Sequence, residues 1–408
     1  MSGAYRWALL ALLGCAYYFH QADRALFGLL TEPIQNELGL TASQIGWINT
    51  ALSWTIAVVT PIAGFVGNRL DRKWVITLSL FFWSLATVGM GFASSFMAVI
   101  LLRSLATGGG ESFYGPSSMA MLARHHEKTR SVAFSIHQAA LYLGLMTCGL
   151  LAAWALGAFG SWRNVFIFFG ACGMALAAVF VFVLKPDRPE RKCAEAEGEK
   201  PSFKDSLKAY FLNRHALLAS SGFVAIVFVN NSYLFWAPKY VVQKYSVGVA
   251  EAGKSVFLYH HLLAFAAILL GGVATDRFVR RMPRFRLFFQ SAALVCGAPA
   301  IAALAFAPSY EAFLVASAAY GLFRGAFEVN THASVFDVVP AAFRSSTVGY
   351  MLLMAFFVGG LFSGWAMGLL FDRFGMHGFE IGVLFMAASY LAAAALTLFS
   401  ALTRKGAI

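Results

Sequence analysis

Long apolar stretches recur along the whole chain, separated by short polar segments. Each is close to the roughly 20 residues that an α-helix needs to cross a hydrocarbon core of about 30 Å. Only 12% of the 408 residues are charged and 59% are hydrophobic, unlike the composition of a soluble domain. The pattern predicts an all-α membrane protein. We expect twelve transmembrane helices, at about 5–30, 43–66, 74–95, 97–123, 131–157, 163–184, 215–238, 250–274, 285–306, 311–338, 345–370 and 379–402.

One loop sequence occurs twice, about half a chain apart. The stretch from Gly64 to Lys73 reads GFVGNRLDRK, and the stretch from Gly272 to Arg281 reads GVATDRFVRR. Both copies follow an apolar stretch and place basic residues where that stretch leaves the membrane. A repeat at this distance indicates two copies of one helical bundle, which is how many secondary transporters are built.

A long hydrophilic segment separates the two halves. Residues 185–214 mix both charge signs with little apolar content, which is typical of a linker. We therefore expect an N-terminal six-helix bundle at 1–184, a cytoplasmic linker at 185–214 and a C-terminal six-helix bundle at 215–408. Within the linker, the stretch from Ser202 to Tyr210 is predicted to form a short surface helix.

The net charge of +12 does not indicate a nucleic-acid partner. Successive spans cross the membrane in opposite directions, so alternate loops lie on the same side. Most of the 31 Lys and Arg residues lie in the loops and tails of one side, and an excess of positive charge marks the cytoplasmic side. We expect a multi-pass monomer in the lipid bilayer of the cell inner (cytoplasmic) membrane, with both termini cytoplasmic. The five cysteines show no metal-binding spacing, so we expect no metal and no cofactor.

The repeated loop resembles a signature of the major facilitator superfamily, Gly-x-x-x-Asp-Arg-x-x-Arg-Arg. The second copy, with Asp276 and Arg277, matches it fully, whereas the first copy has Asn68 before Arg69 where the family has Asp. The resemblance covers essentially the whole chain and implies the fold of that family, with two six-helix halves. It also implies that these four residues form a conformational latch for the outward-facing state, in which we expect the Asn68 copy to be weaker.

Shorter motifs resemble two branches of that family. The sequence HQADR at 20–24 and the segment 103–112 look like the Spinster-like branch, which includes lysolipid and sphingosine-phosphate exporters. The same segments are similar to the anion:cation symporters for sugar acids. Eight positions separate Arg103 from Glu111, where seven are expected in both branches. The segment 324–332 matches neither branch.

Ionisable side chains at membrane depth are the main candidates for a site, because each costs about 2.5–3.5 kcal/mol on insertion scales. At a rise of about 1.5 Å per residue, Asp23 and Arg103 reach similar levels in the outer half of the membrane, and Glu111 lies deeper, near the midplane. Arg324 and Glu328 also fall near the midplane. They share a helix face at i, i+4, so they form either a functional pair or a structural one.

These residues predict an anion site and a proton site. Buried arginines favour an anionic substrate, and we expect it to be bound by Arg24, Arg103, Arg324, His20, His137, Asn230, Asn231 and Asn330. A buried carboxylate either stays charged beside an arginine or is neutralised by a proton. We expect proton coupling through Asp23, Glu111 and Glu328, with protonation releasing an arginine to hold the substrate. His260 and His261 lie about 100° apart on a helix, so at most one faces the pathway.

The sequence therefore predicts a secondary active transporter of an organic anion, a sugar acid or another carboxylate, coupled to protons and working by alternating access. A lysolipid or similar amphiphile is an alternative substrate, and a receptor that has lost transport on the same fold is an alternative function. The sequence contains neither the phosphate-binding loop of an ATP-driven pump nor the residue constellation of a membrane enzyme. We expect no enzymatic activity.

The predicted topology is tested by cysteine labelling. In a cysteine-free background, Lys200→Cys places a thiol in the expected cytoplasmic linker. We expect a membrane-impermeant maleimide to label it in inside-out vesicles and not in intact cells. Labelling from outside intact cells would reverse the orientation.

Overall fold

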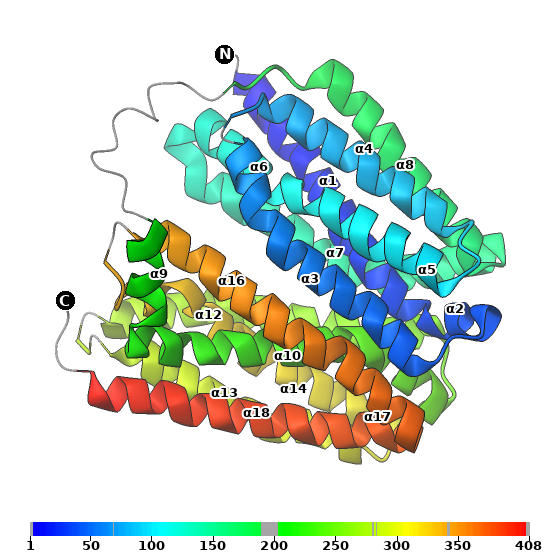
Figure 1. Ribbon diagram of the computed structural model, residues 1–408. Helices are drawn as coiled ribbons and strands as arrows, with labels where there is room; N and C mark the ends of the chain where they lie inside the picture. The colour runs from blue at the N-terminus through cyan, green and yellow to red at the C-terminus, as the bar shows by residue number, and fades with distance from the viewer. Residues whose placement is uncertain are drawn as a thin grey trace. The chain divides into compact units, whose positions relative to one another are not determined.

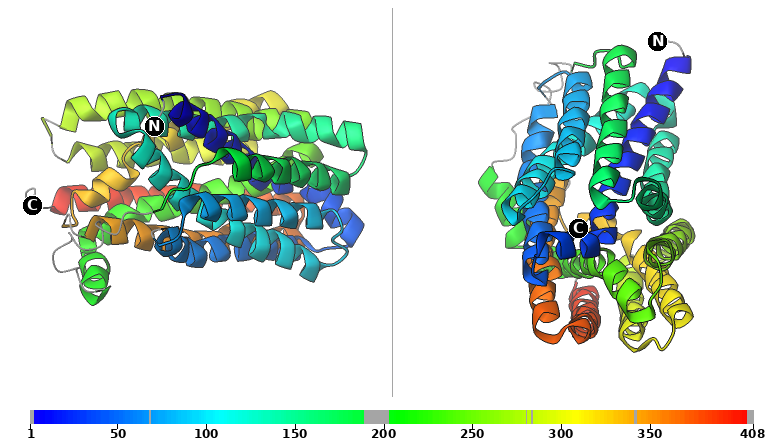
Figure 2. Two further views of the ribbon diagram at one scale, coloured as in Figure 1. Left: turned by 90° about the horizontal axis from the view of Figure 1, so that it is seen from above. Right: turned by 90° about the vertical axis from the view of Figure 1, so that its right-hand side faces the viewer.

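The regular structure is helical throughout in the part of the chain that the computed structural model describes, namely residues 3–67, 69–188, 203–279, 281–282, 284–340 and 343–404. The prediction of an all-α protein is confirmed. The chain divides into two compact units, the first formed by Met1–Ala196 with Gly248–Lys254 and the second by Glu197–Val247 with Ser255–Ile408. Within each unit the helices run side by side (Figures 1 and 2).

The first unit holds the N-terminal helices. They are α1 (Gly3–Leu29), α2 (Thr31–Leu38), α3 (Ala42–Gly67), α4 (Arg72–Met90), α5 (Phe96–Val99), the π-helical segment η1 (Ile100–Thr107), α6 (Gly108–His125), the short η2 (Glu127–Thr129), α7 (Arg130–Phe159), α8 (Trp162–Val183) and α11 (Val249–Gly253). Helix α1 packs against α7, α4 against α8, and α3 against α6. Segment η1 joins α5 to α6 without a break, so the fourth predicted span is one continuous helix.

The second unit holds the remaining helices. They are α9 (Phe203–Phe211), α10 (Arg214–Tyr245), η4 (Lys254–Leu258), α12 (Tyr259–Val279), α13 (Phe285–Phe306), α14 (Tyr310–Glu328), α15 (Thr331–Phe336), α16 (Arg344–Leu361), η6 (Phe362–Ala366), α17 (Met367–Phe374) and α18 (Met376–Thr403). Helix α12 packs against α14, and α10 and α13 pack against α18. The short helix predicted near residues 202–210 is present as α9.

Ten helical segments of the described residues are long and apolar enough to cross a membrane. The other two predicted spans also form helices, α1 and the continuous segment from α5 to α6. These two carry Asp23, Arg24, Arg103 and Glu111. These charged residues interrupt the apolar pattern of the two helices, and they are the same residues that the sequence predicts for the functional site.

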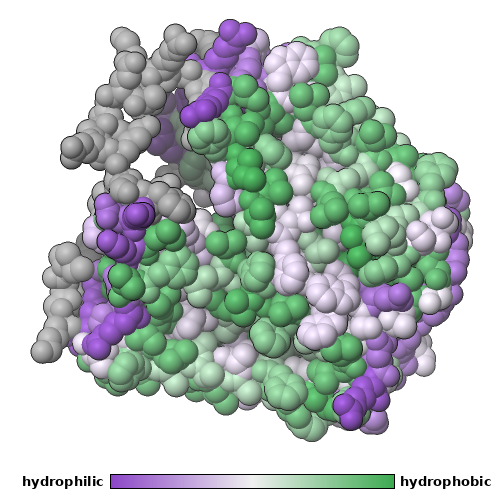
Figure 3. Space-filling view, viewed as in Figure 1, coloured by the Kyte–Doolittle hydropathy of each residue, from purple (hydrophilic) through white to green (hydrophobic). Residues whose placement is uncertain are grey.

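Apolar side chains cover the middle of the helices on the face shown in Figure 3, and hydrophilic side chains gather towards the helix ends. Large exposed residues such as Phe82, Leu270 and Phe385 are expected on a surface that meets lipid. The first unit also has an internal core around Leu13, Trp83 and Phe180. Apolar side chains thus face both the lipid and the interior, which leaves few places for polar groups.

Polar contacts at the helix ends hold the first unit together. Glu37 in α2 accepts hydrogen bonds from Trp162 Nε1 at 2.6 Å and Arg163 Nε at 2.7 Å. At the opposite ends, buried Asp187 accepts from Arg72 at 3.1 Å and Arg124 at 2.8 Å. Asp187 belongs to the expected linker, whose first residues are therefore packed onto the first unit.

The Glu37 contacts predict a pH dependence. The hydrogen bond from Arg163, followed by that from Trp162, lowers the pKa of the Glu37 carboxyl below its ordinary value of 4.5. A carboxyl with a lowered folded-state pKa stabilises the fold above its unfolded pKa, and that stabilisation is lost as the pH falls through the folded pKa. We expect Glu37→Gln to lower the melting temperature at pH 7, with a difference from wild type that shrinks below about pH 4.5. Melting curves of both proteins between pH 7 and pH 3.5 check this, and a pH-independent difference would contradict it.

Candidate functional site

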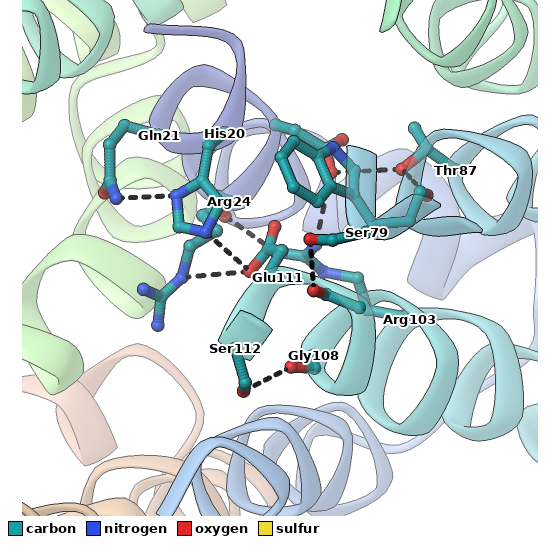
Figure 4. A network of polar contacts seen from close by, with 12 residues as sticks. His20, Gln21, Arg24, Ser79, Thr87, Arg103, Gly108, Glu111 and Ser112 are labelled. Carbon is teal, nitrogen blue, oxygen red and sulfur yellow. Dashed lines mark hydrogen bonds and ion pairs between the residues drawn. The ribbon is translucent and has the colours of Figure 1, made fainter. Parts of the chain in front are cut away.

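The first unit brings four charged residues together in its interior. Asp23 and Arg24 come from α1, Arg103 from η1, and Glu111 from the first turn of α6 (Figure 4). Asp23, Arg103 and Glu111 are 5%, 3% and 3% exposed. Charges this deeply buried remain ionised only when compensated, so their partners determine what the site can do.

Arg103 and Asp23 form a buried ion pair. Arg103 Nη1 lies 3.8 Å from Asp23 Oδ2, and Arg103 Nη2 donates to the carbonyl of Arg24 at 2.9 Å. Thr87 Oγ1 donates to the same Asp23 oxygen at 3.0 Å. The shared depth predicted for Asp23 and Arg103 is therefore confirmed. Thr87 lies one turn after Trp83 on α4, and sequence reasoning assigned it no role.

Glu111 is held less tightly. Its carboxylate oxygens are buried without a hydrogen-bond partner among the described residues. Oε2 lies 3.6 Å from Arg24 Nε and 3.7 Å from His20 Nε2. Gln21 Nε2 lies 2.8 Å from His20 Nδ1, and an amide N–H there donates. This leaves the His20 proton on Nε2, pointing at Glu111. A weakly bound carboxylate beside a proton donor can change protonation state at little cost.

The π-helical segment explains the spacing of Arg103 and Glu111. Eight α-helical residues turn by about 800°, which would leave the two side chains about 80° apart, whereas seven residues bring them to nearly one face. A π-turn accommodates one extra residue. Because η1 starts before Arg103 and ends before Glu111, it lets both side chains face the interior despite the eight-residue spacing.

Two of the three glycines that begin α6 allow close packing. A Cβ atom on Gly110 would lie 3.0 Å from Trp83 Cβ, and one on Gly108 would lie 2.7 Å from a Leu52 methyl group, whereas one on Gly109 would meet nothing within 4 Å. Ser79 Oγ donates to the Gly110 carbonyl at 2.8 Å. Neighbouring helices therefore approach the first and third of these glycines closely.

Aromatic residues line the site beside Glu111. The ring of His137 stacks on Tyr17 at 4.4 Å, and His137 Nε2 lies 3.2 Å from the Tyr114 hydroxyl. Tyr114 donates to the carbonyl of Leu13 at 2.5 Å, and its ring lies 6.0 Å from His20. Tyr17 and Tyr114 were missed by sequence reasoning. Their positions at i−3 from His20 and i+3 from Glu111 were the available signal.

The second unit has its own charged cluster, formed by Asn230, His260, Arg324 and Glu328. Arg324 Nη1 donates to Asn230 Oδ1 at 3.0 Å and lies 3.2 Å from His260 Nε2, and Nη2 donates to Glu328 Oε2 at 2.6 Å. Of the two adjacent histidines, His260 therefore contacts Arg324, whereas His261 Nδ1 lies 2.9 Å from the Phe257 carbonyl.

Other predicted site residues have different surroundings. Asn330 is buried and donates to Thr275 Oγ1 at 3.1 Å, a contact that supports the break between α14 and α15. Asn231 is partly exposed on α10 and, within the described residues, makes no recorded hydrogen bond or ion pair with the Arg324 cluster.

Of the predicted latch residues, Asn68 and the Asp276 side chain lie outside the part that the structure describes. Arg277 is exposed, and the Arg69 guanidinium lies 3.8 Å from the Phe65 ring centre.

The first unit also has an apolar groove of about 800 Å³. Its lining comes from α3, α4, η1 and α6 and includes Trp74, Leu78, Phe82, Gly109 and Phe113. Gly110, which packs against Trp83, also lines the groove, and Glu111 is not among its lining residues. No group of three or more His, Cys, Asp or Glu side chains that could hold a metal ion occurs within the described residues.

The fold of this chain matches that of known membrane transporters. The family model of the Major Facilitator Superfamily matches residues 13–300. The chain belongs to this superfamily. It is a multi-pass membrane transporter and not an enzyme, and the twelve-helix fold predicted from the repeated loop is confirmed.

Two relatives and one solved structure illustrate the likeness. The chain is 27% identical over 301 residues to the probable galactarate/D-glucarate transporter GudP of Bacillus subtilis (strain 168), covering 68% of this chain and 66% of that protein. It is 24% identical over 381 residues to the protein spinster homolog 1 of Xenopus tropicalis, covering 86% and 70%. The crystal structure of a bacterial homolog of the human lysosomal transporter Spinster has a TM-score of 0.86 at 19% identity, covering 99% and 98%.

The π-helical segment generates a prediction about single-residue deletions. Deleting exposed Ala106 removes the extra residue of η1. We expect the segment to become α-helical with the Arg103–Asp23 pair intact, because seven α-helical residues then bring Arg103 and Glu111 to one face.

The matched control deletes exposed Met119 from the regular part of α6, which rotates the rest of that helix by about 100°. We expect the Ala106 deletion to keep a melting temperature close to wild type and the Met119 deletion to lower it strongly. Equal losses in thermal unfolding of the purified proteins would contradict the role given to η1.

Proposed function

We propose that this transporter carries an organic anion, a sugar acid or another carboxylate, in symport with protons by alternating access. The observation that carries the proposal is the uneven coordination of the two carboxylates in the first unit. Asp23 pairs with Arg103 and also accepts a hydrogen bond from Thr87, whereas Glu111 has ion-pair contacts with Arg24 and His20 and, within the described residues, no hydrogen bond. Such an arrangement supplies both a fixed charge pair and a carboxylate that can take up a proton.

Glu111 and Arg24 are the exchanging pair in this proposal. When Glu111 is charged, it attracts the Arg24 guanidinium 3.6 Å away. A proton on Glu111 removes that attraction, and Arg24 then needs another anion. The Arg24 side chain is 28% exposed and the Glu111 side chain 1%, so the arginine can reach a substrate while the acid remains enclosed. Proton uptake and anion binding thereby favour each other, which is the requirement for symport.

His20 is placed to orient the Glu111 carboxylate. Its Nε2 faces Glu111 Oε2, and its Nδ1 accepts a hydrogen bond from the Gln21 amide. Because an amide N–H is not a proton source, His20 acts in this proposal as a hydrogen-bond donor beside Glu111 and not as a proton relay. His137 and Tyr114 are fully buried beside it, and the Tyr114 hydroxyl already donates to a backbone carbonyl, so the two rings pack around the site and do not meet the substrate.

A carboxylate fits this site better than an amphiphile. Asp23, Arg103 and Glu111 are buried in the first unit, and none of them lines the apolar groove. The likeness to a galactarate/D-glucarate transporter supports a sugar acid. The groove and the likeness to spinster homolog 1 favour an amphiphile as the second candidate, in which case an acyl chain would occupy the groove.

The role of Glu111 is tested with Glu111→Gln, which mimics the protonated acid. We expect the variant to keep D-galactarate binding and counterflow in proteoliposomes, because Arg24 and Arg103 are unchanged. It should lose accumulation driven by a pH gradient, because Gln cannot release a proton. Arg24→Ala should weaken D-galactarate binding at least about a hundredfold, because it removes the guanidinium that the proposal assigns to the substrate anion.

Glu37→Gln is the matched control, since it removes a carboxylate of the same unit outside the site. It should retain both activities. Accumulation by Glu111→Gln that equals wild type would exclude Glu111 as the proton site. Binding of lysophosphatidylcholine, but of no sugar acid, by the wild-type protein would favour the second candidate.

A further inference from the structure

The Arg324 cluster of the second unit differs from the first unit's site in how its arginine is held. Two of its acceptors, Asn230 and His260, are uncharged. Because an arginine N–H can only donate, His260 Nε2 must accept and its proton lies on Nδ1, which is 3.3 Å from the Ser317 carbonyl. These contacts fix the position of Arg324 without neutralising its charge.

Close packing of α12 on α14 keeps this arrangement in place. Gly321 and Gly325 stand one turn apart on α14, a spacing that lets membrane helices approach closely. A side chain at Gly321 would overlap with the backbone of His260, and one at Gly325 would overlap with the backbone of Ala264. The guanidinium of Arg324 is therefore preorganised by neutral neighbours and tightly packed helices.

The negative charge comes from Glu328, which is placed differently. The Arg324 side chain is 7% exposed and the Glu328 side chain 37%. Glu328 is also the last residue of α14, and the chain turns at Val329 and Asn330 before α15 begins. Rotation about its side-chain bonds is enough to move the carboxylate off Nη2, whereas Arg324 stays bound to Asn230 and His260.

We propose that Asn230, His260 and Arg324 form a carboxylate-binding subsite that Glu328 occupies as an internal substitute for a substrate carboxylate. A buried arginine without an anion is strongly unfavourable, so Glu328 leaves only when another anion arrives. A substrate carboxylate carries one negative charge, as Glu328 does, so it can replace Glu328 without changing the net charge of the cluster. A phosphate carries about 1.5 to 2 negative charges at pH 7 and would bring excess charge into the cluster. This inference deepens the proposed function, because it gives a carboxylate substrate a second arginine.

The direct test is chemical rescue of Glu328→Ala by acetate. Removing the Glu328 carboxylate takes away the negative charge that compensates buried Arg324. We therefore expect the melting temperature of the purified protein to fall by roughly 5 °C or more. Sodium acetate should restore most of that loss, while sodium chloride at equal ionic strength should not. Arg324→Ala with Glu328→Ala, which lacks the guanidinium, should show no acetate effect.

Glu380→Ala is the matched control within the same unit. It removes a carboxylate that pairs with Lys244 at 2.9 Å, where both side chains are about one quarter exposed, and its stability should not depend on acetate. Equal acetate effects in Glu328→Ala and Glu380→Ala, or none in Glu328→Ala, would overturn the proposal. Equal rescue by inorganic phosphate would overturn its assignment to carboxylates.

A second measurement concerns competition. Glu328→Gln keeps the size of the side chain but removes its charge, so D-galactarate should bind this variant about tenfold more tightly than wild type once the internal competitor is gone. Unchanged or weaker binding would contradict the substitution of Glu328 for substrate. Absence of D-galactarate binding to wild type and variant alike would count against the proposed sugar-acid function, while the acetate result would still decide the Arg324 subsite.

Discussion

The cost of a charge inside the membrane governs the arrangement of this protein. Nearly every other position of the helices is apolar and faces lipid or a packed interior, so an ionised side chain must obtain its compensation from other side chains. Among the described residues, the buried carboxylates and arginines of α1, η1, α6 and α14 lie in such groups. In the proposed function, the charged groups that change partner during transport are the ones with the fewest hydrogen bonds or the greatest exposure.

The two units meet this constraint in different ways. In the first unit, Asp23 and Arg103 pair with support from the Thr87 hydroxyl, and Glu111 depends on ion-pair contacts to Arg24 and His20 without a hydrogen bond in the described residues. In the second unit, Arg324 is oriented by neutral acceptors and neutralised by Glu328. A charge pair that stays together stabilises the fold. In the proposed function, a carboxylate that is protonated or displaced changes the charge of its cluster when a proton or a substrate binds.

Local backbone features make both arrangements possible. The π-helical turn η1 accommodates an extra residue, so that Arg103 and Glu111 face the same interior. On α14, Gly321 and Gly325 allow the α12 backbone close enough for His260 to reach Arg324. The two glycines have no side chain, and the extra residue of η1 acts through the geometry of the backbone. Both determine which charged side chains can meet, so substitutions there should affect function without touching the substrate.

The sequence alone determined the helical membrane fold, the repeated halves and the residues that carry charge at depth, because apolar length and loop position are local properties of the chain. It also placed Asp23 level with Arg103, since helical rise is nearly constant. Only the tertiary structure decided that Arg24 faces Glu111, that Tyr17 and Tyr114 line the site, that His260 rather than His261 meets Arg324, and that Asn330 supports a helix break. Those pairings join helices far apart in the chain. They depend on helix rotation, which one extra residue in a π-turn changes by about 100°, and on how closely glycines let two helices approach.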